Sequence, residues 1–286
     1  MKLLSFTRNG SASFGAVLGD GVFDLQPRLG ARYPTLRFAL VADAQEEIRR
    51  LLDGASPDFA LSEISYLPPI PDPEKIICVG RNYGEHVKEG NNAATERPML
   101  FPRYPSAHVG HGQNIVRPFV SDRLDYEGEL ACVIGRYARH VPASRALEYI
   151  AGYTCFNDGS VRDWQKHTHQ LMQGKTFWRS GAIGPWIVTA DEIPDPSALN
   201  LSTKVNGAEM QNSSTSQMIF DIPYLIEYIS TIIDLQPGDI IATGTPEGVG
   251  LHRKPPVFLK QGDVVEITLS SIGTLRNAVI DERPPA

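Results

Sequence analysis

The run DYEGELACVI, residues 125–134, joins two carboxylates to an apolar strand. Side chains two positions apart in a strand point to the same face, so Glu127 and Glu129 are expected to project together. Their like charges then require a cation or a raised pKa. A hard divalent ion is the natural partner of such carboxylates, and the alternative is a pair of solvent-facing carboxylates at a sheet edge. Gly128 between them favours close packing against this strand.

Short apolar runs bounded by Gly and Pro recur on both sides of this stretch, and such runs are typical of strands. Only two runs in this part of the chain predict helices, Ser144–Ile150 and Asp221–Ile233. Strands outnumber helices and no strand–helix alternation is sustained, which predicts an α+β, β-dominated fold. The predicted strands are Lys75–Val79, Leu130–Ile134, Ile187–Thr189, Ser202–Val205, Asp239–Ala242 and Val264–Leu269.

The first 70 residues are expected to form a small α/β domain, with a catalytic domain over residues 71–286. The proline-rich run LPPIPDP, residues 67–73, indicates a boundary between them because proline stiffens the chain and removes backbone donors. A helix is expected after Asp43, ended by Gly54. The strands expected in this small domain are Lys2–Thr7, Ser13–Leu18 and Val22–Leu25.

Composition limits the classes of partner. The 286 residues carry a net charge of −6, which disfavours nucleic-acid binding. No apolar run is long enough for a membrane helix, and no signal peptide is recognised. The three cysteines are widely spaced within apolar runs and predict buried reduced thiols, as in a cytoplasmic protein.

Three further positions could carry chemistry. Asp158 ends an apolar run and would complete an all-oxygen site with the two glutamates, although capping a turn is its ordinary role. Glu89 lies three residues after His86 and could orient it as a general base, unless the two are a chance surface pair. Lys175, flanked by Gly174, could bind an oxyanion or simply occupy a turn.

The glycine-rich run TGTPEGVG, residues 243–250, lacks the Gly-Lys-Ser/Thr ending of a phosphate loop. It is expected to offer hydroxyl and backbone N–H groups to a carboxylate. His167 and His169 lack a further metal-ligating partner nearby and are interpreted as helix-end or surface residues.

The order and spacing of these motifs resemble the fumarylacetoacetate hydrolase family over residues 75–283. The motifs are GRNYGEHVKE, DYEGEL, NDGSVRDWQ, GKTF, IGPWIVTADEIPDP, KVNG and TGTPEGVG. The resemblance implies a mixed, rolled β-sheet domain that pairs as a homodimer and binds a small anionic 2-oxo acid. The site it implies holds Mg²⁺ or Mn²⁺ on Glu127, Glu129 and Asp158, has His86, Glu89 and Lys175 as catalytic residues, and has Arg81, Tyr83, Gln165 and Thr245 near the substrate.

For activity, the resemblance implies a metal-dependent hydrolase of an acylpyruvate, of a kind found in the catabolism of aromatic compounds. His86, oriented by Glu89, would deprotonate water, Lys175 would stabilise the oxyanion, and the products would be pyruvate and a carboxylic acid. Isomerisation, tautomerisation or decarboxylation of a 2-oxo dioic acid on the same metal site is the alternative, and a non-catalytic metal-stabilised binding protein is a remote one. The intact His86–Glu89 pair favours hydrolysis.

Three segments depart from common patterns of this family. Trp178-Arg179-Ser180 stands where many members have acidic or small polar residues, and Arg103 stands where many have lysine. Both segments are expected near the substrate. The polar insert 91–97 is expected to change the behaviour of the lid that carries His86.

Overall fold

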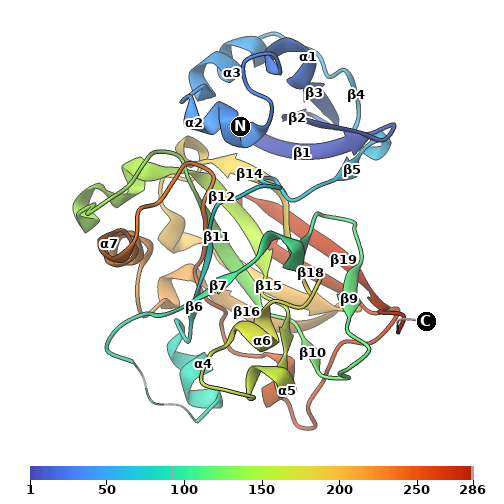
Figure 1. Ribbon diagram of the computed structural model, residues 1–286, viewed down its shortest axis with the longest axis vertical. Coiled ribbons are helices and arrows are strands. Elements are labelled where there is room, and N and C mark those ends of the chain that lie inside the picture. Colours follow the sequence, from blue (N-terminus) through green and yellow to red (C-terminus); the bar gives the residue numbers. More distant parts are fainter. Residues whose placement is uncertain (92, 94, 285–286) are drawn as a thin grey trace.

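Two large β-sheets dominate the computed structural model, which describes residues 1–91, 93 and 95–284 (Figure 1). The first has twelve strands in the order β4-β3-β2-β1-β14-β12-β11-β17-β6-β7, with β5 added to β1 and β8 added to β14. The second has five strands in the order β16-β15-β18-β19-β9, and β10 pairs with β13 separately. The fold is α+β and β-dominated, as the sequence predicts.

The strands have the following bounds: β1 Lys2–Arg8, β2 Ser11–Leu18, β3 Gly21–Asp24, β4 Phe59–Ala60, β5 Ser65–Tyr66, β6 Ile76–Gly80, β7 Met99–Arg103, β8 His108–Val109, β9 Ile115–Arg117, β10 Leu124–Asp125, β11 Gly128–Ile134, β12 Ile150–Asn157, β13 Ser160–Val161, β14 Gly181–Thr189, β15 Asn200–Val205, β16 Ala208–Ser214, β17 Ile240–Ala242, β18 Val264–Leu269 and β19 Gly273–Asp281. The α-helices are α1 Gln26–Leu29, α2 Leu36–Val41, α3 Gln45–Leu52, α4 Gly84–Glu89, α5 Arg162–Gln165, α6 Met172–Lys175 and α7 Ile222–Ile232.

The N-terminal part continues the large sheet. Strand β1 pairs with β2 on one side and with β14 on the other, where Leu3 lies opposite Ile187. Figure 1 shows this part, with α1–α3, at the end of the molecule opposite α4, α5 and α6. Because one sheet crosses the expected boundary, the division of the chain at residue 70 stays a prediction.

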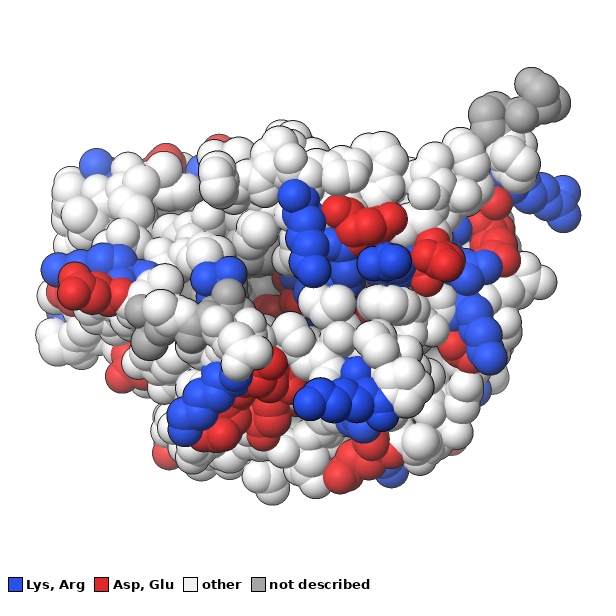
Figure 2. Space-filling model, turned by 90° about the horizontal axis from the view of Figure 1, so that it is seen from below, with Lys and Arg blue, Asp and Glu red and all other residues white. Residues whose placement is uncertain are grey.

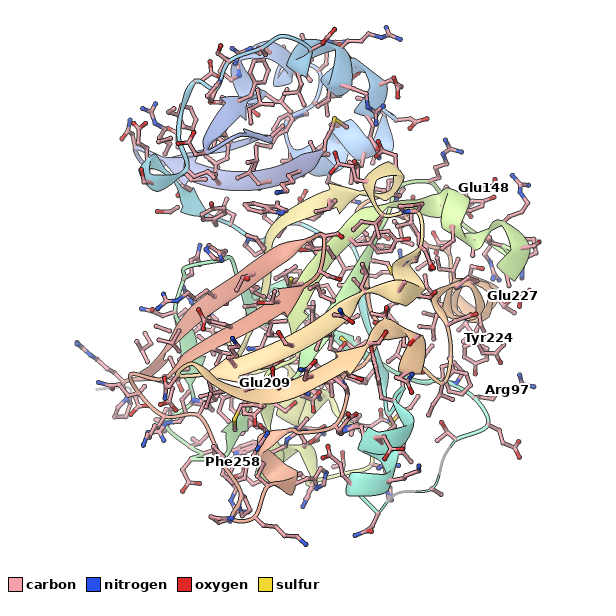
Figure 3. All side chains as sticks on the ribbon, turned by 180° about the vertical axis from the view of Figure 1, so that it is seen from behind. Arg97, Glu148, Glu209, Tyr224, Glu227 and Phe258 are labelled. Carbon is pink, nitrogen blue, oxygen red and sulfur yellow. The ribbon has the colours of Figure 1, made fainter. Side chains whose placement is uncertain are left out.

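The two sheets pack face to face at β11, whose seven residues are all buried. A side chain at Gly128 would not fit, since an added Cβ would lie 2.2 Å from Thr203 Oγ1 on β15. The close packing predicted at Gly128 is therefore confirmed. Figure 3 shows the five-stranded sheet from behind, with Glu209 of β16 on its outer edge.

Most predicted elements are present, and the differences have local causes. Strand β14 begins six residues before the predicted start, because Gly181, Gly184 and Pro185 read as turn signals although they lie in the strand. The predicted helix 144–150 is a 3-10 helix, Ala143–Tyr149. Helix α7 is confirmed, and the side chain of Asp221 caps it by accepting the N–H of Tyr224 at 2.9 Å.

The predicted thiols are free and buried at Cys78, Cys132 and Cys155. Across the described part of the chain, no helix has the length and apolar character needed to span a bilayer.

Candidate active site

Three buried carboxylates meet where two antiparallel strands adjoin. Glu127 and Glu129 flank the first residue of β11, and Asp158 follows the last residue of β12. Because Gly128 pairs with Asn157, the start of one strand lies beside the end of the other. Oxygen atoms of the three carboxylates lie within 4.8 Å of one another. The structure thus brings together the three residues that the sequence analysis grouped.

Two of these carboxylates are each held by two cations. Lys175 Nζ lies 2.6 Å from both Glu127 Oε2 and Asp158 Oδ2. Arg162 Nη1 lies 2.6 Å from Glu127 Oε1, and Arg103 Nη1 lies 2.5 Å from Asp158 Oδ1. Burial alone would lower the pKa of Lys175, but the charges of Asp158 and Glu127 outweigh burial and raise it. The lysine therefore stays protonated.

Glu129 has a different environment. Within the described residues its one hydrogen-bond donor is the N–H of Gly244, 2.8 Å from Oε2. Burial raises the pKa of Glu129, and the charges of Asp158 and Glu127 raise it further. Burial would also raise the pKa of Glu127, but the charges of Lys175 and Arg162 hold it below its usual range. Among the residues that the structure describes, no lysine or arginine forms an ion pair with Glu129, and a divalent cation with oxygen ligands fits that deficit.

Asp125 and Arg162 complete the buried network, and the sequence analysis missed both. The carboxylate of Asp125 accepts Arg162 Nε at 2.8 Å and the N–H groups of Gly250 and Leu251 at 2.8 and 2.9 Å. Asp125 is the first residue of the DYEGEL motif, but no spacing rule pairs it with an arginine 37 positions later. The pair links the carboxylate cluster to the end of the glycine-rich loop.

His86 and Glu89 form the pair that their spacing suggests. Both lie on α4, and His86 Nδ1 is 2.8 Å from Glu89 Oε1. Glu89 Oε2 accepts the N–H of Gly248 at 3.0 Å. Burial would raise the pKa of Glu89, but these two hydrogen bonds lower it. A Glu89 carboxylate directs the Nδ1 proton of His86 towards itself and leaves Nε2 for proton exchange.

The loop 243–250 does donate N–H groups to carboxylates, as its sequence predicts, but these carboxylates belong to the protein. Its left-handed residues Gly244 and Gly248 have φ angles of +105° and +95°. The three N–H groups, those of Gly244, Gly248 and Gly250, bind the carboxylates of Glu129, Glu89 and Asp125 respectively.

A cavity of about 680 Å³ opens above the carboxylates. Its wall includes His86, Lys175 and three of the four residues expected near the substrate, Arg81, Gln165 and Thr245. Tyr83, the fourth, is fully buried and lies outside the lining. Its hydroxyl group finds no hydrogen-bond partner within the described residues.

The geometry agrees with a family match over most of the chain. The family model described as "Fumarylacetoacetate (FAA) hydrolase C-terminal" matches residues 75–280. The chain belongs to the fumarylacetoacetate hydrolase family.

Relatives within this family carry different activities in their names. The chain is 41% identical over 270 residues to the mitochondrial oxaloacetate tautomerase FAHD2A of Bos taurus, covering 92% of this chain and 85% of the relative. It is 37% identical to the structure of 5-carboxymethyl-2-hydroxymuconate delta-isomerase from Mycobacterium smegmatis, with a TM-score of 0.78. It is 30% identical to maleylpyruvate hydrolase from Sphingobium sp. SYK-6, solved with manganese and pyruvate, with a TM-score of 0.83. Both structural alignments cover 99% of this chain and 100% of the other.

Arg103 and the segment Trp178-Arg179-Ser180, both expected near the substrate, do not line the cavity, although Arg103 contacts Asp158 of the carboxylate cluster. Arg103 is buried and donates from Nη2 to Ser180 Oγ at 3.0 Å, while Trp178 is exposed. In the segment 91–97, residues 92 and 94 lie outside the described residues. Its last residue, Arg97, donates to the Tyr224 hydroxyl on α7 at 2.8 Å (Figure 3).

Proposed function

We propose that this protein is a divalent-metal-dependent tautomerase of a 2-oxo dioic acid of the oxaloacetate type. The observation that carries the proposal is the His86–Glu89 pair at a cavity above three carboxylates, in a chain 41% identical to an oxaloacetate tautomerase over 92% of its length. Tautomerisation, which the sequence analysis gives as part of the alternative, therefore ranks above acylpyruvate hydrolysis.

Glu127, Glu129 and Asp158 would hold Mg²⁺ or Mn²⁺, and the raised pKa of Glu129, which has no ion-pair partner among the described residues, supports this assignment. When bound, the ion supplies Lewis-acid stabilisation of negative charge on the 2-oxo oxygen. Lys175 and Arg162 keep Glu127 charged, so that carboxylate is ready to act as a ligand.

The residues of the chain then perform the proton transfer. His86 Nε2 accepts a proton from C3 of the substrate, the CH₂ carbon next to the 2-oxo group. The imidazolium then donates this proton to the 2-oxo oxygen, which gives the enol. Glu89 orients the ring through Nδ1 and stabilises its positive charge. Gln165 and Thr245 line the cavity and would contact the substrate. No atom is gained or lost in this conversion, so the cavity needs to hold no reacting water.

Hydrolysis of an acylpyruvate is the second candidate. The same His86–Glu89 pair could deprotonate water, and the fold matches maleylpyruvate hydrolase with a TM-score of 0.83. Decarboxylation of a 2-oxo dioic acid would use the same site. The homodimer and the cytoplasmic location remain part of this proposal, although the animal relative is named as a mitochondrial protein.

The test is a substrate panel assayed with Mg²⁺ or Mn²⁺ and read by product analysis. For oxaloacetate we expect faster interconversion of the keto and enol forms, measured as a change in ultraviolet absorbance without a change in molecular mass. This acceleration should be lost in His86→Ala. Release of pyruvate and a carboxylic acid from acylpyruvates, without faster tautomerisation of oxaloacetate, would replace the proposal by hydrolysis. Release of CO₂ as the main product would replace it by decarboxylation.

A further inference from the structure

Four side chains at the outer part of the cavity have no role in the carboxylate cluster or in the His86–Glu89 pair. They are Arg81, Lys166, His169 and His252, and all four line the cavity. They come from separate segments, namely the turn after β6, the stretch after α5 and the 3-10 helix Gly250–His252. Lys166 and His169 are exposed, whereas Arg81 and His252 are half-buried. Figure 2 shows this end of the molecule, with Lys and Arg side chains around a hollow.

The charges of this outer group are not balanced within the cavity. The carboxylates that line the cavity are Glu127, Glu129 and Asp158, all buried at its floor. Lys175, Arg162 and Arg103 already pair with that floor. Within the described residues neither Arg81 nor Lys166 forms an ion pair with any carboxylate. An anion in the outer cavity would therefore meet two uncompensated positive charges.

Backbone geometry fixes two of the four residues. Arg81 has a φ of +57°, a region that residues with a Cβ rarely adopt and that often marks functional sites. His252 follows Gly250 and Leu251, whose N–H groups bind Asp125. The ring centroid of His252 lies 6.2 Å from that of His86. Asp125 thus holds a second imidazole beside the proposed base.

We propose that Arg81, Lys166, His169 and His252 form a subsite for the second carboxylate of a 2-oxo dioate. Arginine and lysine bind carboxylates through charge-assisted hydrogen bonds, and the two imidazoles add N–H donors. The subsite rests on the proposed function, because it assumes that the 2-oxo acid end of the substrate binds at the three carboxylates on the cavity floor. It selects dianions over 2-oxo acids that have one carboxylate.

The first experiment compares oxaloacetate with its 4-ethyl ester, which keeps the 2-oxo acid and the enol but loses the distal charge. In the double variant Lys166→Ala/His169→Ala we expect KM for oxaloacetate to rise about tenfold while kcat for oxaloacetate is unchanged. For the ester, both kcat and KM should be unchanged. Lys204→Ala is the matched control, because Lys204 is exposed on β15 and does not line the cavity. A KM that rises equally for both substrates, or for neither, would overturn the subsite.

The second experiment measures binding instead of turnover. Calorimetry on the Mn²⁺-loaded protein compares 2-oxoglutarate with 2-oxobutanoate, which differ in the distal carboxylate. We expect tighter binding of 2-oxoglutarate, and loss of that preference in Lys166→Glu. A protein that keeps the preference but does not accelerate tautomerisation of oxaloacetate would refute the proposed function and support the subsite. Tautomerisation without any preference would refute the subsite alone.

Discussion

The floor of the cavity and the helix beside it are built in different ways. Glu127 and Asp158 lie at strand ends, are buried, and each contacts two cations. His86 and Glu89 lie on the six-residue helix α4, with 13% and 23% of their side chains exposed. One hydrogen bond connects this pair to the neighbouring loop, from the N–H of Gly248 to Glu89. The floor is thus part of the folded core. The His86–Glu89 pair, in contrast, can be substituted without disrupting that core.

The largest expected effect comes from removing Glu129. Glu129→Ala should abolish Mn²⁺ binding and lower kcat/KM by about 10³-fold or more, because the ion loses a ligand and its Lewis acidity is worth several kcal/mol. Titration calorimetry with Mn²⁺ and steady-state kinetics measure the two effects. The control is Glu209→Ala on the exposed edge of β16 (Figure 3), which should change neither. Full activity of Glu129→Ala in the presence of a chelator would exclude the metal assignment.

Glu127→Ala should instead reduce the stability of the metal-free protein. The substitution leaves Lys175 and Arg162 buried with one carboxylate partner fewer each, a change that costs about 3–5 kcal/mol in comparable buried pairs. Glu129→Ala removes a carboxylate whose pKa is raised by burial and then by the charges of Asp158 and Glu127, so it should leave stability unchanged or higher. Urea unfolding of both variants in chelator measures this contrast, and equal loss of stability would contradict it.

His86→Ala should slow proton transfer by about 10²-fold or more. Metal affinity should stay unchanged, because His86 lies outside the carboxylate cluster. Kinetics and Mn²⁺ calorimetry on the same preparation separate the two properties. Loss of Mn²⁺ binding together with activity would place His86 among the groups that hold the metal.

The smallest expected effect is that of Glu89→Gln, which keeps the shape of the side chain but loses its charge. A hydrogen bond to a charged group is worth about 1.5–3 kcal/mol, so kcat should fall about tenfold. Glu85→Gln on the same helix is the control, since Glu85 is exposed and pairs with Lys88. A fall of similar size in both variants would show that α4 responds to charge in general and not to the His86 contact.

The sequence predicts the parts of the site that follow from local periodicity. Strand alternation groups Glu127 with Glu129, and helical spacing pairs His86 with Glu89. The resemblance to the family added Gln165 and Thr245, which line the cavity, and Tyr83, which does not.

The contacts that the sequence could not predict join residues far apart in the chain. Arg103 and Asp158 are 55 positions apart, and Arg162 reaches Asp125 across 37. These pairings depend on sheet order, in which β11 lies between β12 and β17, and no local pattern encodes that order. The early start of β14 could not be predicted because a local signal was present but misleading. Its glycines and proline indicate a turn, whereas pairing with β12 makes this segment a strand.

The bond from Gly248 N–H to Glu89 gives the position of α4 a natural reporter. A backbone amide exchanges its proton with solvent only when its hydrogen bond opens. If α4 moves away to admit a substrate, the Gly248 amide must lose its acceptor, whereas the Gly244 amide, bound to Glu129, keeps its own. The ratio of deuterium uptake at these two glycines would then record how often the cavity opens, without any substitution in the chain.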